Sequence, residues 1–66
     1  MRTELIKATK QHAIGHIEKH RVNVEILMTN PVGIGEHGDV MDEIEKEILE
    51  MAKYQDILDI LEKYFG

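Results

Sequence analysis

A short stretch in the middle of the chain decides the fold, because it separates two long segments with helical patterning. Residues 30–38 read Asn30-Pro31-Val32-Gly33-Ile34-Gly35-Glu36-His37-Gly38 and contain the only proline and three of the five glycines of the chain. Proline disfavours a helical conformation at the residue before it, and glycine readily adopts backbone conformations that interrupt helices. We therefore expect a first helix at about residues 3–28, a loop at about 29–38 and a second helix at about 39–65.

The first segment carries apolar side chains at the spacing of one helix face. These are Ile6, Ala13, Ile14, Ile17, Val24 and Leu27, and His20 falls among them. Residues 20–26 also alternate between polar and apolar side chains, a pattern typical of a strand. We favour the helix, because a lone strand has no partner in so short a chain. A strand contributed to an intermolecular sheet is the alternative.

The second segment begins with a favourable helix cap and carries a broad apolar surface. Asp39 suits the N-cap position, and Asp42 and Glu43 place negative charge where the helix dipole stabilises it. One apolar stripe consists of Met41, Ile44, Ile48, Met51, Leu58 and Phe65, and an adjacent one of Tyr54, Ile57, Leu61 and Tyr64. Together the two segments predict one all-α domain over residues 1–66, a two-helix antiparallel hairpin.

The hairpin is too small to form a large core by itself, so we expect copies to associate. A chain of 66 residues buries only about 60% of its unfolded surface, and without cysteine it has no disulfide or cysteine-bound metal to add stability. The merged stripes of the second segment are wider than the ~100° that one neighbouring helix covers. We predict a homo-oligomer, a dimer or higher, in which hairpins assemble into a helical bundle. The predicted interface residues are Gly15, Val22, Tyr54, Ile57, Leu61 and Tyr64.

The charge balance argues against some classes of partner. The net charge of −5 disfavours binding to a nucleic-acid backbone. This charge is divided unevenly, since residues 1–28 hold five Lys or Arg against three acids and residues 39–66 hold three against nine. No apolar run approaches the ~20 residues of a membrane span, and no apolar signal core follows the N-terminus. We expect a cytoplasmic protein without a nucleic-acid or membrane partner.

Three histidines of the first segment, His12, His16 and His20, are spaced four residues apart. Helix neighbours at this spacing are able to share a metal ion, although each step drifts by about 40° around the helix, so that three do not easily meet one ion. His16 and His20 are the better pair, with a carboxylate from a neighbouring helix completing the site. The competing interpretation packs His20 between helices and leaves the others in solvent. Apart from this metal site we predict no cofactor.

The loop contains more side-chain chemistry than a plain connector requires. Its apolar residues Val32 and Ile34 and its charged pair Glu36 and His37 fit a structured connector, a partner-contact surface or a small-anion site before the second helix. It lacks the glycine and lysine spacing of phosphate-binding loops. The candidate contact residues are Asn30, Pro31, Val32, Ile34, Glu36 and His37. Because the chain has neither serine nor cysteine as a nucleophile, we do not expect an enzyme.

The stretch from Asn30 to His37, followed by Ile44-Glu45-Lys46-Glu47-Ile48 and Tyr54, resembles a small uncharacterised protein of marine T-even-like tailed phages. The resemblance covers roughly residues 20–65. It implies a cyanophage or marine metagenomic origin and residence in the host cytoplasm, and it implies no activity. The leading hypothesis is a small oligomeric helical interaction or structural module, an accessory phage protein that binds a host or virion protein. The alternative is a protein that holds a metal or small anion at a subunit interface.

Overall fold

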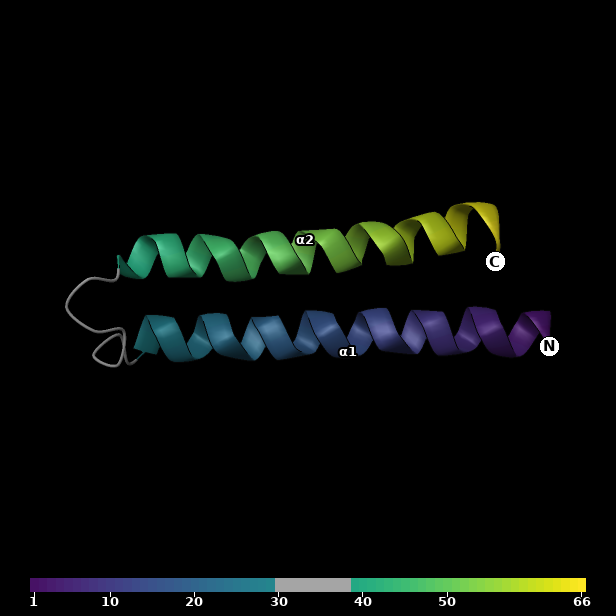
Figure 1. Cartoon of the computed structure of the whole chain (residues 1–66), viewed down its shortest axis with the longest axis horizontal. Coiled ribbons are helices and arrows are strands. Elements are labelled where there is room, and N and C mark those ends of the chain that lie inside the picture. The colour runs from purple at the N-terminus through teal and green to yellow at the C-terminus, as the bar shows by residue number, and fades with distance from the viewer. Residues whose placement is uncertain (30–38) are drawn as a thin grey trace.

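Two antiparallel helices make up the part of the chain that the computed structural model describes, residues 1–29 and 39–66 (Figure 1). Helix α1 spans Arg2–Thr29 and helix α2 spans Val40–Tyr64. They lie side by side in a body of 49 × 16 × 15 Å, with both chain termini at the same end. The predicted all-α hairpin is confirmed. Residues 20–26 belong to α1, so the alternative of a strand there is wrong.

Local signals account for the beginning and the end of α2. Asp39 is the N-cap with an extended backbone, and its carboxylate accepts a hydrogen bond of 2.8 Å from the Met41 amide. This contact satisfies one of the free amides of the first turn. Asp42 and Glu43 lie in the same turn, and Lys63 lies in the last turn, where positive charge is favourable. The predicted N-cap is therefore confirmed.

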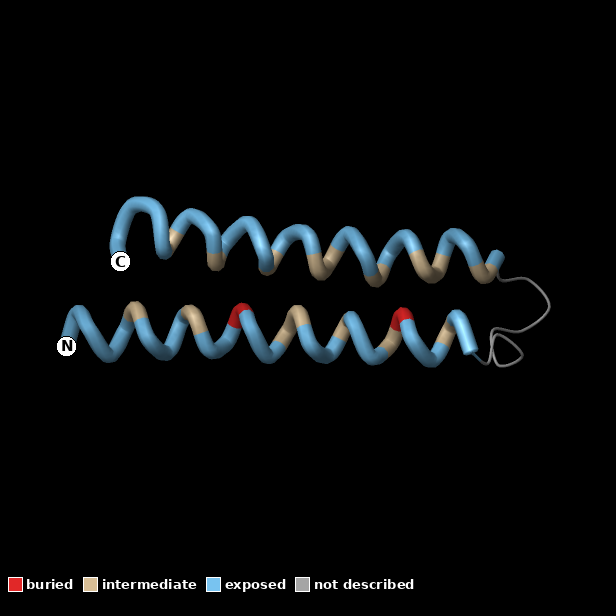
Figure 2. Tube along the Cα trace, turned by 180° about the vertical axis from the view of Figure 1, so that it is seen from behind, coloured by how far each residue is buried: buried red, intermediate tan, exposed pale blue. Residues whose placement is uncertain are grey.

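The side chains between the helices recur alternately three and four residues apart, which is the heptad spacing of a coiled coil. On α1 they are Ile6, Lys10, Ala13, Ile17, His20, Val24 and Leu27, and on α2 they are Val40, Ile44, Glu47, Met51, Tyr54, Leu58 and Leu61. We call these fourteen residues the seam. Figure 2 shows that the covered positions follow the sides of the two helices that face each other.

The seam covers few side chains completely. Among the described residues only Ala13, 1% exposed, and Val24, 9% exposed, are buried. Met41 and Ile48 share a helical stripe with Ile44, but they lie beside the seam and are exposed. One neighbouring helix covers only a narrow strip of α2, which explains this difference. Neither of the two described helices contains an apolar stretch sufficient to cross a membrane.

Ala13 provides a test of the seam, because its small side chain sets how closely the helices approach. We expect Ala13→Leu to lower the free energy of unfolding by about 1–3 kcal/mol, since a larger side chain has to push the helices apart. The matched control is Ala8→Leu on the exposed side of α1, which we expect to change stability by less than about 0.5 kcal/mol. Urea denaturation followed by circular dichroism measures both, and equal effects would contradict the observed packing.

Candidate functional site

Three histidines of α1 gather around one tyrosine of α2. The rings of His16 and Tyr54 stack with centroids 4.3 Å apart and an interplanar angle of 10°. His12 lies 4.4 Å from His16, and His20 lies 6.3 Å from Tyr54. The spacing of four residues places the histidines in a row along α1, and Tyr54 meets this row because it occupies the seam. We call these four residues the ring cluster.

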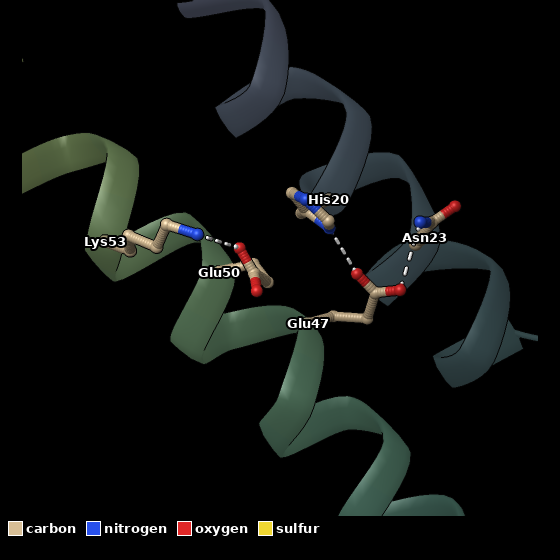
Figure 3. A network of polar contacts seen from close by, with 5 residues as sticks. All are labelled: His20, Asn23, Glu47, Glu50 and Lys53. Carbon is tan, nitrogen blue, oxygen red and sulfur yellow. Dashed lines mark hydrogen bonds and ion pairs between the residues drawn. The ribbon is translucent and has the colours of Figure 1, made fainter. Parts of the chain in front are cut away.

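A carboxylate of α2 connects His20 of the ring cluster to Asn23 on α1 (Figure 3). One oxygen of Glu47, Oε2, lies 2.5 Å from Nδ1 of His20, and the other, Oε1, accepts a hydrogen bond of 3.0 Å from Asn23 Nδ2. A carboxylate only accepts, so the His20 contact is a hydrogen bond when Nδ1 carries the proton. The side chains of His20 and Glu47 are 13% and 24% exposed. This polar contact therefore replaces apolar packing between the helices.

The surroundings of His16 disfavour protonation of its ring. Its Nδ1 atom is covered by protein and meets no hydrogen-bond partner among the described residues. The pKa of His16 lies below its ordinary value of 6.5, first because the ring is desolvated. Positive charge on His12, Lys19 and His20 lowers this pKa further, whereas Glu50 on α2 raises it. A proton on Nδ1 would lack an acceptor, which agrees with this direction.

The predicted metal site lacks a full set of ligands in the hairpin. The rings of His16 and His20 stack 6.2 Å apart. Nδ1 of His20 is already engaged by Glu47, and Nδ1 of His16 is covered. Within residues 1–29 and 39–66 no three His, Asp or Glu side chains are grouped so that they could hold an ion. A metal at His16 and His20 would need ligands from outside the described hairpin.

The other predicted site residues fall into three groups. The loop residues Asn30, Pro31, Val32, Ile34, Glu36 and His37 lie outside the described residues. Tyr54 and Leu61 of the predicted oligomer interface face α1 across the seam. The remaining interface residues, Gly15, Val22, Ile57 and Tyr64, are exposed, and no atom lies within 4 Å of where a Cβ of Gly15 would be. Their role between copies stays a prediction.

Two residues of the site, Asn23 and Glu47, are absent from the candidates that the sequence suggests. The sequence does contain a signal for Glu47, because it occupies a heptad position between Ile44 and Met51. A charged residue at such a position indicates a polar contact across the seam. Asn23 carries no comparable signal, since it lies beside the seam and is one of many polar residues on α1.

No protein-family model matches this chain, and no curated protein or solved structure is significantly similar to it. Its function therefore has to be inferred from the geometry and chemistry of the hairpin itself.

Removal of the Glu47 carboxylate tests the polar contact. Glu47→Ala leaves His20 and Asn23 without their shared acceptor, and we expect it to lower the free energy of unfolding by about 1–3 kcal/mol. Asp56→Ala removes an exposed carboxylate from the same helix and serves as the control, with an expected effect below about 0.5 kcal/mol. Chemical denaturation measures the free energy of unfolding of both variants under the same conditions. A loss no larger for Glu47→Ala than for Asp56→Ala would refute a stabilising contact.

The lowered pKa of His16 predicts how the free energy of unfolding changes with pH. Below about pH 6.5 the unfolded chain binds a proton at His16 more readily than the folded chain does, so the contribution of His16 to stability is intact above 6.5 and is lost as the pH falls from 6.5 through the lowered pKa of the folded state. We expect the free energy of unfolding to fall as the pH drops below about 6.5, and His16→Gln to remove part of that fall.

Titration of the ring protons by NMR provides the direct check. The His16 resonance, assigned by its loss in His16→Gln, is expected to titrate with a midpoint below 6.5 in the folded protein. In denaturing urea the titration midpoint of the same ring proton is expected to return to the ordinary value of 6.5, and this measurement is the control. A folded-state midpoint at or above 6.5 would contradict the prediction.

Proposed function

We propose that this chain is a helical interaction module that works as a self-associated bundle, with two hairpins forming a homodimer. One observation carries the proposal, namely the large apolar surface that the hairpin leaves exposed. The exposed large apolar side chains include Leu5, Ile14, Ile26, Met28, Met41, Ile48, Leu49, Ile60 and Phe65. Met41 is 74% and Leu49 68% exposed, values expected of residues that meet a partner rather than a core.

The total exposed area supports the same proposal. The structure exposes 5162 Å², whereas a compact monomer of 7.6 kDa exposes roughly 4,300 Å². Its radius of gyration is 15.0 Å, against about 11 Å for a compact domain of this length. The surplus of roughly 900 Å² is close to the ~800 Å² that each partner contributes to a standard protein interface.

Two paired hairpins form a central apolar core, which one hairpin lacks. A four-helix bundle encloses a central core, because each helix then packs against two neighbours. The outer surface of such a bundle is left to contact a further protein. On the resemblance to marine phage proteins, we propose that this further partner is a host or virion protein and that the chain acts as a phage accessory protein.

The mass of the native protein in solution tests the self-association. At micromolar concentration we expect sedimentation equilibrium to give about twice the 7.6 kDa of one chain. The melting temperature is expected to rise with protein concentration, because association stabilises the folded state by mass action. A native mass of one chain, with a melting temperature independent of concentration, would overturn the proposal.

A further inference from the structure

The first two histidines of the ring cluster lie next to each other on the surface of α1. The ring centroids of His12 and His16 are 4.4 Å apart, and the two ring planes are tilted by 58°. Residues four apart are neighbours on one side of a helix, so the helix itself keeps these two rings together. They form a pair of metal-binding groups whose spacing is set by the backbone.

The separation of these two rings is close to the one that a shared metal ion requires. An imidazole nitrogen binds zinc at ~2.0–2.1 Å, so two rings at neighbouring coordination positions of one ion have centroids ~4.5–5 Å apart. His16 and His20 fit less well, because their centroids are 6.2 Å apart. Nδ1 of His20 is also engaged by Glu47. The structure therefore favours His12 with His16 over the pair that the sequence suggests, His16 with His20.

A hollow in the surface of α1 lies beside the two rings. Its volume is about 280 Å³, and its lining residues are Gln11, His12, Gly15, His16 and Lys19. No atom lies within 4 Å of where a Cβ of Gly15 would be, so the space above this glycine is open. An ion with its water ligands therefore has access to the paired rings from solvent.

The position of the His16 ring decides which of its atoms is left for an ion. Nδ1 is covered by protein and has no hydrogen-bond partner among the described residues, so Nε2 is the nitrogen that remains for a ligand from solvent. Tyr54 stacks on the ring at 4.3 Å with an interplanar angle of 10°, and this contact restricts how the ring turns. A group that is already oriented loses less conformational freedom when it binds.

The charges around His16 neither exclude nor strongly attract a cation. Desolvation, and then positive charge on His12, Lys19 and His20, lowers the pKa of His16, whereas Glu50 of α2 raises it. A bound cation meets the same Lys19 and Glu50, whose effects oppose each other. Metal binding requires the neutral imidazole, so a lowered pKa reduces the competition from protons at pH 7.5.

We propose that His12 and His16 bind one divalent transition-metal ion, Cu²⁺, Ni²⁺ or Zn²⁺, through their imidazole nitrogens, with water as the remaining ligands. Imidazole suits these three ions, whereas Mg²⁺ and Ca²⁺ prefer oxygen. Within residues 1–29 and 39–66 no third His, Asp or Glu side chain completes the set, so binding is weaker than at a structural zinc site with four protein ligands. Both ligands belong to α1, so the inference does not depend on the proposed self-association.

Isothermal titration of the tag-free protein with Ni²⁺ at pH 7.5 tests the proposal. We expect one ion per chain with an affinity in the micromolar range. His12→Gln and His16→Gln each leave a single imidazole and are expected to weaken binding at least about tenfold. His20→Gln removes the third histidine of the ring cluster and is expected to leave the affinity unchanged. Circular dichroism verifies that each variant is helical, and His12 is exposed, so its replacement does not disturb the seam.

The matched control exchanges two neighbouring residues of α1. Gln11→His combined with His12→Gln keeps the number of histidines and the net charge, but residues 11 and 16 are five apart and lie on different sides of the helix. We expect this variant to bind Ni²⁺ as weakly as His12→Gln does. In NMR spectra of the wild-type protein, Zn²⁺ is expected to shift the ring protons of His12 and His16 and to leave those of His20 in place.

Three outcomes would overturn the proposal. The first is no Ni²⁺ binding by the folded wild-type protein. The second is wild-type affinity in His12→Gln or in the exchange variant, which would show binding to single imidazoles. The third is a loss in His20→Gln as large as in His16→Gln, which would assign the ion to the pair His16 and His20.

Discussion

The contact between two helices along a single narrow seam is the constraint on which the rest of this structure depends. A helix packed against one neighbour covers only a strip of its circumference, so the apolar residues outside that strip have nothing within the hairpin to cover them. This explains why Ala13 and Val24 are the only buried residues among those described, and why Met41 and Leu49 remain exposed. Much of the apolar surface of the two described helices is therefore exposed.

Polar residues occupy several positions of the seam. Lys10, His20 and Glu47 occupy positions that apolar residues would fill in a more stable seam. The contact between His20 and Glu47, supported by Asn23, forms only when α1 and α2 are in one relative register. Polar residues at seam positions define register in coiled coils in the same way. The pKa of the neighbouring His16 lies below its ordinary value, first because its ring is desolvated.

The charge of a surface affects which alignment with a partner is favoured, in addition to the contact between apolar side chains. Apolar contact drives association without fixing orientation, whereas opposite charges at the two ends of a face favour one alignment over another. In this hairpin residues 1–14 and 53–66 hold five Lys or Arg against four acids, whereas residues 15–29 and 39–52 hold three against eight.

The sequence by itself determines the helices, because their causes are local. Asp39 caps α2 through its own neighbour, and helical spacing of apolar residues needs no knowledge of distant parts of the chain. The position of His16 and His20 on one side of α1 follows from their spacing in the sequence for the same reason. Only the tertiary structure decides which of several overlapping apolar stripes becomes the seam, since that depends on how α1 lies against α2. That choice places Tyr54 beside the histidines, brings Glu47 to His20 and Asn23, and leaves Ile48 on the outside.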